Sequence, residues 1–103
     1  MQQLAALNWK VEQDCLVARQ CPSLEVDQFQ SALQQWLKDN DGTMPHIEWG
    51  ADRLQCQFNC LGNQWLLHYE TLCNALWIEP VQRSARSSIA ALMHHLNRRI
   101  FTP

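Results

Sequence analysis

The sequence predicts an α+β fold, a two-layer sandwich in which an antiparallel sheet of about five to six strands carries two helices on one face. Between residues 53 and 80, apolar and polar residues alternate with period two, which indicates strands with one buried face. Two segments, near residues 25–40 and 84–97, place apolar residues at the spacing of amphipathic helices. The predicted order is ββ-α-(β)βββ-α, and helices in such an order cover one face of the sheet.

The bulk composition is that of a single globular domain over residues 1–103. Hydrophobic residues make up 47% and charged residues 17% of the chain, which is typical of folded proteins and excludes a disordered one. The first residues lack the basic and apolar regions of a signal peptide, and no apolar run approaches the ~18 residues of a membrane span. We therefore expect a cytoplasmic protein without membrane contact, in which the five cysteines stay reduced.

The N-terminal part of the chain predicts a hairpin followed by a helix. Weak alternation over residues 7–19, interrupted by polar residues 12–14, predicts a short hairpin. The helix is predicted over residues 25–40, with Ser23 as its N-cap and Gly42 in the left-handed conformation at its end. Its buried face is predicted to consist of Val26, Phe29, Leu33, Trp36 and Leu37.

The segment from residue 44 to residue 80 is predicted to supply four strands. Residues 44–49 look extended and include a proline, which sheets tolerate at an edge, so we expect an edge strand there. A three-stranded meander follows over residues 53–60, 65–70 and 75–79, where the alternation is regular.

Two tight turns fix the predicted register of this meander. Gly62 supplies the positive φ for a two-residue turn at Gly62-Asn63, and a second two-residue turn is expected at Cys73-Asn74. Both turns place the same alternating set of side chains toward the helices. The counted register pairs Cys60 with Trp65, Phe58 with Leu67, Cys56 with Tyr69, Leu54 with Thr71, Tyr69 with Ile78 and Thr71 with Leu76.

The last helix is predicted over residues 84–97, with Ser84 as its N-cap. Residues 81–103 carry four arginines and no acid, whereas residues 1–80 carry four basic and ten acidic residues. This asymmetry fits a solvated helix that pairs with the acidic body, or an adaptor surface for an anion or nucleic acid. The apolar stripe is predicted to be Ala85, Ile89, Leu92, Met93, Leu96 and Ile100, and the anion-binding residues to be Arg83, Arg86, Arg98 and Arg99.

The sheet face opposite the helices is the predicted functional surface. In the counted register, His68 stands opposite Glu79 and Glu70 opposite Trp77. Apolar residues among charges and amides are typical of an interaction surface, and tryptophan is enriched at binding hot spots. The sequence therefore predicts a small binding domain that contacts a protein partner or a second copy in a homodimer. The alternative is that the N-terminal hairpin of the same chain covers this apolar patch. The predicted binding residues are Leu66, His68, Glu70, Trp77 and Glu79.

The same surface permits a small-molecule binding protein or an enzyme that uses His68 with Glu70 or Glu79. A carboxylate beside an imidazole can orient the ring as a general base requires. However, cross-strand pairs of this kind are usually structural, and no serine or cysteine nucleophile is expected beside His68 on that face. The sequence therefore favours binding over catalysis.

No metal site or cofactor is predicted. Cys56 and Cys60 lie four residues apart on one strand, which separates their Cα atoms by ~13 Å and prevents them from sharing one tetrahedral ion. His94 and His95 are adjacent on a helix, so their side chains project about 100° apart. Glycine-rich phosphate loops are absent and no basic residues interleave the strand aromatics, which disfavours binding of nucleic acid.

Three runs of residues, Trp49–Arg53, His68–Glu70 and Trp77–Pro80, resemble a family of short bacterial proteins that is catalogued as a domain of unknown function. The resemblance covers most of the chain. It implies a bacterial cytoplasmic protein with a single domain, and it brings no activity, cofactor or site residue with it.

Overall fold

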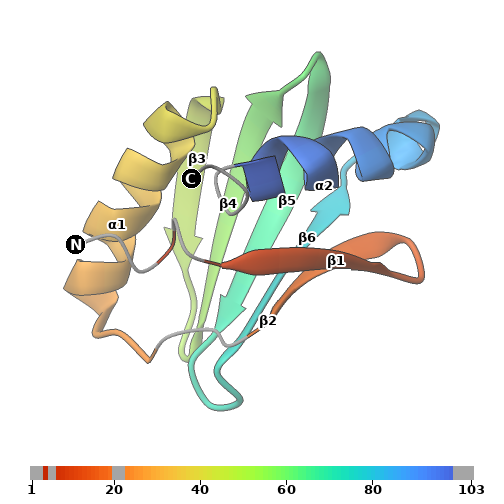
Figure 1. The fold of residues 1–103 in the computed structure, drawn as a ribbon. Helices are drawn as coiled ribbons and strands as arrows, with labels where there is room; N and C mark the ends of the chain where they lie inside the picture. The colour runs from red at the N-terminus through yellow and green to blue at the C-terminus, as the bar shows by residue number, and fades with distance from the viewer. Residues whose placement is uncertain (1–3, 5–6, 20–22, 99–103) are drawn as a thin grey trace.

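A computed structural model describes residue 4, residues 7–19 and residues 23–98 of the chain, without the side chain of Val26. In this part the strands and helices follow one another as predicted, and the α+β fold class is confirmed (Figure 1). In chain order the elements are β1 (Asn8–Glu12), β2 (Cys15–Arg19), α1 (Val26–Asp39), β3 (Thr43–Trp49), β4 (Arg53–Cys60), β5 (Asn63–Glu70), β6 (Ala75–Pro80), the 3₁₀ helix η1 (Arg83–Ser88) and α2 (Ile89–Asn97).

The strands form one antiparallel sheet in the order β1-β2-β6-β5-β4-β3. The meander β3 to β6 supplies four neighbouring strands of this sheet. The N-terminal hairpin adds the other two, because β2 pairs with β6 at Leu16–Ile78 and Val17–Trp77. The predicted edge strand is confirmed as β3, which pairs only with β4 in the described sheet. No helix in the described part of the chain is long and apolar enough to cross a membrane.

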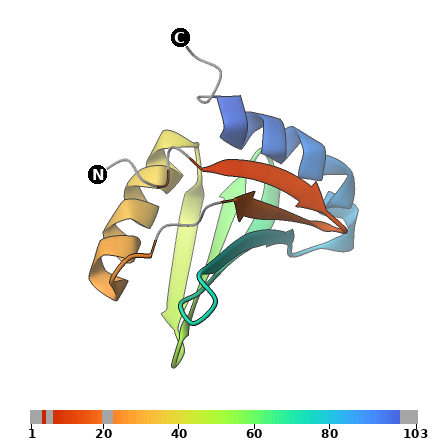
Figure 2. The same ribbon diagram turned by 60° about the horizontal axis from the view of Figure 1, so that its bottom comes forward.

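The core lies between the inner face of the sheet and the two helices. Figures 1 and 2 show α1 beside β3 and α2 alongside β1. The ring of Trp36 in α1 lies 5.9 Å from that of Trp9 in β1 and 6.1 Å from that of Phe58 in β4. Phe29 stacks on Tyr69 with ring centroids 3.9 Å apart. Aromatic contacts of this kind join the hairpin, α1 and the meander into one core.

The register predicted for β4 and β5 is wrong by two residues. The turn consists of Leu61 and Gly62, so Phe58 lies opposite Trp65 and Cys56 opposite Leu67. Leu61 has a φ of 52° and Gly62 a φ of 79°, as a type I′ hairpin turn requires at both central positions. Because side chains alternate with period two, a shift of two residues leaves every side chain on its predicted face.

The turn between β5 and β6 is also longer than predicted. Residues 71–74 form a four-residue loop, which places Tyr69 opposite Leu76 and Leu67 opposite Ile78. The predicted pairs with Thr71 therefore do not form, since Thr71 lies in the loop and donates a hydrogen bond to the carbonyl of Asp52. The shift is again even, and the inner face stays as predicted.

The N-terminal end of α1 is capped by Glu25 and not by Ser23 as predicted. Glu25 and Gln28 form a capping box, in which the Gln28 side chain accepts a hydrogen bond from the Glu25 amide at 3.2 Å. This reciprocal pair satisfies amides that a serine two residues earlier could not reach.

At the C-terminal end of α1, the left-handed residue is Asp41, with a φ of 63°, and not Gly42 as predicted. Gly42 is needed for space, because a Cβ atom there would lie 2.7 Å from Cδ2 of Leu37. The glycine therefore permits close packing on the helix that it follows.

The predicted last helix begins with the 3₁₀ helix η1, and α2 starts only at Ile89, so Ser84 is not its N-cap. The first turn contains serines, which compete for backbone hydrogen bonds, and no acid to complement the helix dipole. The predicted stripe is confirmed at Ala85, Ile89, Leu92 and Leu96, which are buried, and at Met93, which is partly buried; Ile100 lies outside the described residues.

Candidate functional site

The sheet face away from the helices carries a connected group of side chains on β4, β5 and β6. These strands present Gln55, His68 and Trp77 in one cross-strand row, because Gln55 pairs with His68 and His68 with Trp77. Side chains two residues along each strand point the same way and extend the row. We call the resulting group, made of Arg53, Gln55, His68, Glu70, Trp77 and Glu79, the outer cluster.

His68 is the buried centre of the outer cluster, with 5% of its surface exposed. Its Nε2 lies 2.5 Å from Oε2 of Glu79, so the predicted His–Glu contact forms, although along a diagonal and not between opposite residues. Its Nδ1 lies 3.4 Å from Nε2 of Gln55. The ring stacks on Trp77 at a centroid distance of 4.8 Å and an angle of 12°. Contacts at both ring nitrogens and on one face fix the imidazole in place.

Arg53 also contacts Trp77. Glu70 lies opposite Ala75, and not opposite Trp77 as predicted, and its carboxylate forms an ion pair with Nη2 of Arg53 at 2.5 Å. The guanidinium carbon of Arg53 lies 5.8 Å from the centroid of Trp77, within the range of a cation–π contact. A continuous chain of contacts thus runs from Glu70 through the indole to Glu79. Sequence reasoning missed Arg53, although its alternation places it on this face.

The N-terminal hairpin lies beside this face and does not fold over Trp77. Val17 of β2 is the backbone partner of Trp77, so the hairpin extends the sheet laterally. Trp77 is half-buried, and so is Leu66, which stands opposite Gln57 and Glu79 and makes no polar contact in the outer cluster. The five predicted residues therefore share one face, and four of them belong to the outer cluster.

The geometry of His68 is that of a supporting side chain. A general base needs a ring nitrogen within reach of the proton that it takes, whereas both nitrogens of His68 face protein side chains. Cys15 on the neighbouring strand β2 carries a thiol whose pKa is raised by burial and then by the carboxylates of Glu79, Glu12 and Asp14. A protonated thiol is a poor nucleophile.

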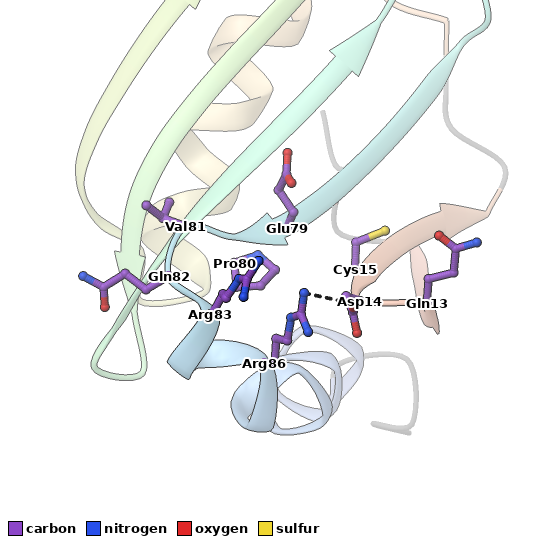
Figure 3. Close-up of a pocket in the computed structure, with 9 residues that line it drawn as sticks. All are labelled: Gln13, Asp14, Cys15, Glu79, Pro80, Val81, Gln82, Arg83 and Arg86. Carbon is purple, nitrogen blue, oxygen red and sulfur yellow. Dashed lines mark ion pairs between the residues drawn. The ribbon is translucent and has the colours of Figure 1, made fainter.

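A pocket of about 280 Å³ opens next to the outer cluster, between the β1–β2 turn, the end of β6 and η1 (Figure 3). Its charged residues come from all three segments, and an Nη2 of Arg86 lies 3.4 Å from a carboxylate oxygen of Asp14. Glu79 lines the pocket while its carboxylate contacts His68. We call this site, which includes Asp14, Cys15, Glu79, Arg83 and Arg86, the hairpin pocket.

The four arginines predicted to bind anions are separated by the fold. Arg83 and Arg86 both line the hairpin pocket. Arg98 lies at the far end of α2, where it donates hydrogen bonds to Oδ1 of Asn40 at 3.1 Å and to the carbonyl of Asp39 at 3.0 Å. It therefore caps the C-terminal end of α1. Arg99 lies outside the described residues.

Among the described residues, no three His, Cys, Asp or Glu side chains are grouped so that they could hold a metal ion. Cys56 and Cys60 are buried on the inner face of β4. Burial raises the pKa of Cys56 to about 11, which keeps its thiol protonated and unsuited to metal binding near neutral pH. These cysteines act as small apolar core residues.

The fold and the outer cluster define a small α+β domain with one open sheet face. Residues 4–98 match the sequence model of DUF3630, a family described as a protein of unknown function, and the chain belongs to this family. The matched region contains both the outer cluster and the hairpin pocket. The resemblance to a domain of unknown function is thus confirmed. No curated protein and no solved structure matches the chain.

Proposed function

We propose that this protein is a binding domain that recognises another protein through the outer cluster. The observation that carries the proposal is the half-buried indole of Trp77, which contacts the ring of His68 and the guanidinium of Arg53 on the sheet face away from the helices. Tryptophan and arginine are the side chains most enriched at the energetic centres of protein interfaces.

The contacts within the cluster reduce the entropy that binding would cost. Immobilising a side chain at an interface costs about 0.5–1.5 kcal/mol. Here Arg53 is already held by Glu70, and His68 by Glu79 and Gln55. The side chains of Arg53 and Glu79 remain 45% exposed, so both signs of charge are available to a partner around the indole. This supports a contact with a flat, mixed apolar and charged protein surface.

The strand edges are less suited to association than the open face. Edge β3 contains Pro45, a register shift between Thr43 and His46, and a positive φ of 53° at Met44, all of which interrupt pairing with another strand. Edge β1 carries an exposed ion pair between Lys10 and Glu12 at 2.8 Å. Such features oppose edge-to-edge pairing and leave the sheet face as the surface for a partner.

Substitution of Trp77 tests the proposal. The Trp77→Ala variant should bind the partner at least about 30-fold more weakly, which corresponds to a hot-spot loss of about 2 kcal/mol. Leu72→Ala is the matched control, because Leu72 is 80% exposed in the β5–β6 loop and is not part of the outer cluster. The measurement is capture of partners by the tagged protein, competed by untagged protein, together with sedimentation equilibrium of the protein alone. Near-UV circular dichroism shows whether the variant keeps its fold.

Loss of the same partner in Trp77→Ala, but not in Leu72→Ala, would support the proposal. A Trp77-dependent dimer in the centrifuge would identify the partner as a second copy of this chain. A monomer whose Trp77→Ala variant keeps every competable partner would refute it.

A cytoplasmic location belongs to the same proposal and is supported by the free thiols of Cys15, Cys56, Cys60 and Cys73.

A further inference from the structure

We propose that the hairpin pocket binds a small oxyanion, a phosphate or carboxylate group, through Arg83 and Arg86. This inference does not depend on the proposed protein contact, because it rests on Arg83 and Arg86, which lie outside the outer cluster; the two sites share only Glu79. It starts from the backbone of η1. In a 3₁₀ helix, side chains three residues apart lie directly above one another, so Arg83 and Arg86 leave η1 on one side (Figure 3).

Arg83 is the charged side chain of the pocket that forms no ion pair among the described residues. The carboxylate of Glu79 instead contacts Nε2 of His68. The thiol of Cys15 is neutral near pH 7, because burial and the neighbouring carboxylates raise its pKa. The pair between Arg86 and Asp14 is long, at 3.4 Å, and joins two side chains that are more than half exposed. An exposed pair of this kind is weak and can be displaced.

The position of Asp14 indicates which kind of ligand would fit the hairpin pocket. Its carboxylate already lies against the guanidinium of Arg86 (Figure 3). A guanidinium offers paired N–H donors that match the oxygens of a carboxylate or phosphate. An incoming oxyanion would contact Arg83 and take the place of Asp14 on Arg86.

The size of the pocket limits the ligand. A volume of about 280 Å³ equals that of about nine water molecules at ~30 Å³ each. It is slightly below the range of ~300–1,000 Å³ for sites that enclose drug-sized ligands. The pocket therefore suits a small metabolite with a phosphate or carboxylate group, and not a nucleic acid polymer.

Titration calorimetry with inorganic phosphate and with succinate, each against chloride at equal ionic strength, tests the proposal on the full chain. Arg83→Gln should weaken binding of the better probe at least tenfold. Asp14→Asn should strengthen it severalfold, because a competing carboxylate is removed. Arg19→Gln is the matched control, since Arg19 is an exposed arginine at the opposite end of the same hairpin.

Tighter binding of phosphate would identify a phosphorylated ligand, and tighter binding of succinate a carboxylate ligand. Amide NMR shifts of residues 13–15 and 82–86 should respond to the probe in either case. The proposal is overturned if neither probe binds more tightly than chloride, or if Arg19→Gln weakens binding as much as Arg83→Gln. It is also overturned if Asp14→Asn brings no gain in affinity.

Discussion

Cys56 and Cys60 lie on the inner face of β4, with their thiols among the side chains of the core. Burial raises the pKa of Cys56 from 9.0 to about 11 and also raises that of Cys60, because a thiolate there would lose its hydration. Cys73, in contrast, is exposed in the loop after β5. The same side-chain type thus serves as a core residue at two positions and faces solvent at a third.

The raised pKa of Cys56 predicts a loss of stability in alkali. Below pH 9 the thiol is protonated in both the folded and the unfolded chain, so its contribution is fully present. Between pH 9.0 and about 11 only the unfolded chain ionises, and the free energy of unfolding should fall by up to about 3 kcal/mol from this group. Urea denaturation across this range should show a shallower fall for Cys56→Ala than for the wild type. Parallel pH profiles would contradict the prediction.

At the scale of an element, the β4–β5 hairpin combines a favourable and an unfavourable residue in one turn. Both Leu61 and Gly62 have positive φ. Glycine adopts this conformation freely, whereas a leucine there places its Cβ against the carbonyl oxygen at a cost of roughly 1–2 kcal/mol. Leu61 is also 46% exposed, so it gains little from burial. The twist of the two long strands, and not the preference of Leu61, therefore sets the turn type.

Substitution of these two residues should change stability in opposite directions. Leu61→Asn creates the Asn-Gly pair that type I′ turns favour and should stabilise the fold by about 0.5–1 kcal/mol. Gly62→Ala should destabilise it by about 1 kcal/mol through φ alone, because no atom lies within 4 Å of the added Cβ. Urea midpoints of the two variants test both signs. A stabilising Gly62→Ala or a destabilising Leu61→Asn would show that the turn has another conformation.

At the scale of the whole molecule, Asn97 joins the two ends of the described chain. Its Oδ1 accepts a hydrogen bond from the amide of Trp9 at 2.9 Å, and its Nδ2 donates one to the carbonyl of Trp9 at 2.8 Å. The side chain thus pairs with edge strand β1 as a neighbouring strand would. Because the two residues are 88 positions apart, this contact fixes α2 against the hairpin and closes the core.

Removal of this contact should destabilise the entire domain. Asn97→Ala leaves a buried amide and a buried carbonyl of Trp9 without partners, at about 1–3 kcal/mol for each group. We expect a loss of about 2–4 kcal/mol in the free energy of unfolding, measured by urea denaturation with circular dichroism and tryptophan fluorescence. Asn8→Ala, on the exposed neighbour of Trp9, should change stability by less than about 0.5 kcal/mol. A similar small effect at Asn97 would refute this role.

The sequence pattern predicts most residues of the outer cluster. Alternation along two strands assigned His68, Glu70, Trp77 and Glu79 to one face and predicted the contact between His68 and Glu79. The other partners of these residues were not predicted, because a periodic pattern is unchanged when a strand shifts by two residues. Arg53 therefore reaches Glu70 and Trp77 through a register that only the actual turns define.

The sequence by itself determined the fold class, the order of the elements and the faces of the strands, since these follow from periodicity within short segments. The tertiary structure decided the pairing of β2 with β6, which places Asp14 beside Arg86 and forms the hairpin pocket from two segments far apart in the chain, near residues 13–15 and 79–86. It also decided that η1 precedes α2 and that Asn97 reaches Trp9. Contacts such as these depend on the conformation of the turns and on packing between elements far apart in the chain. Local residue patterns determine neither of these.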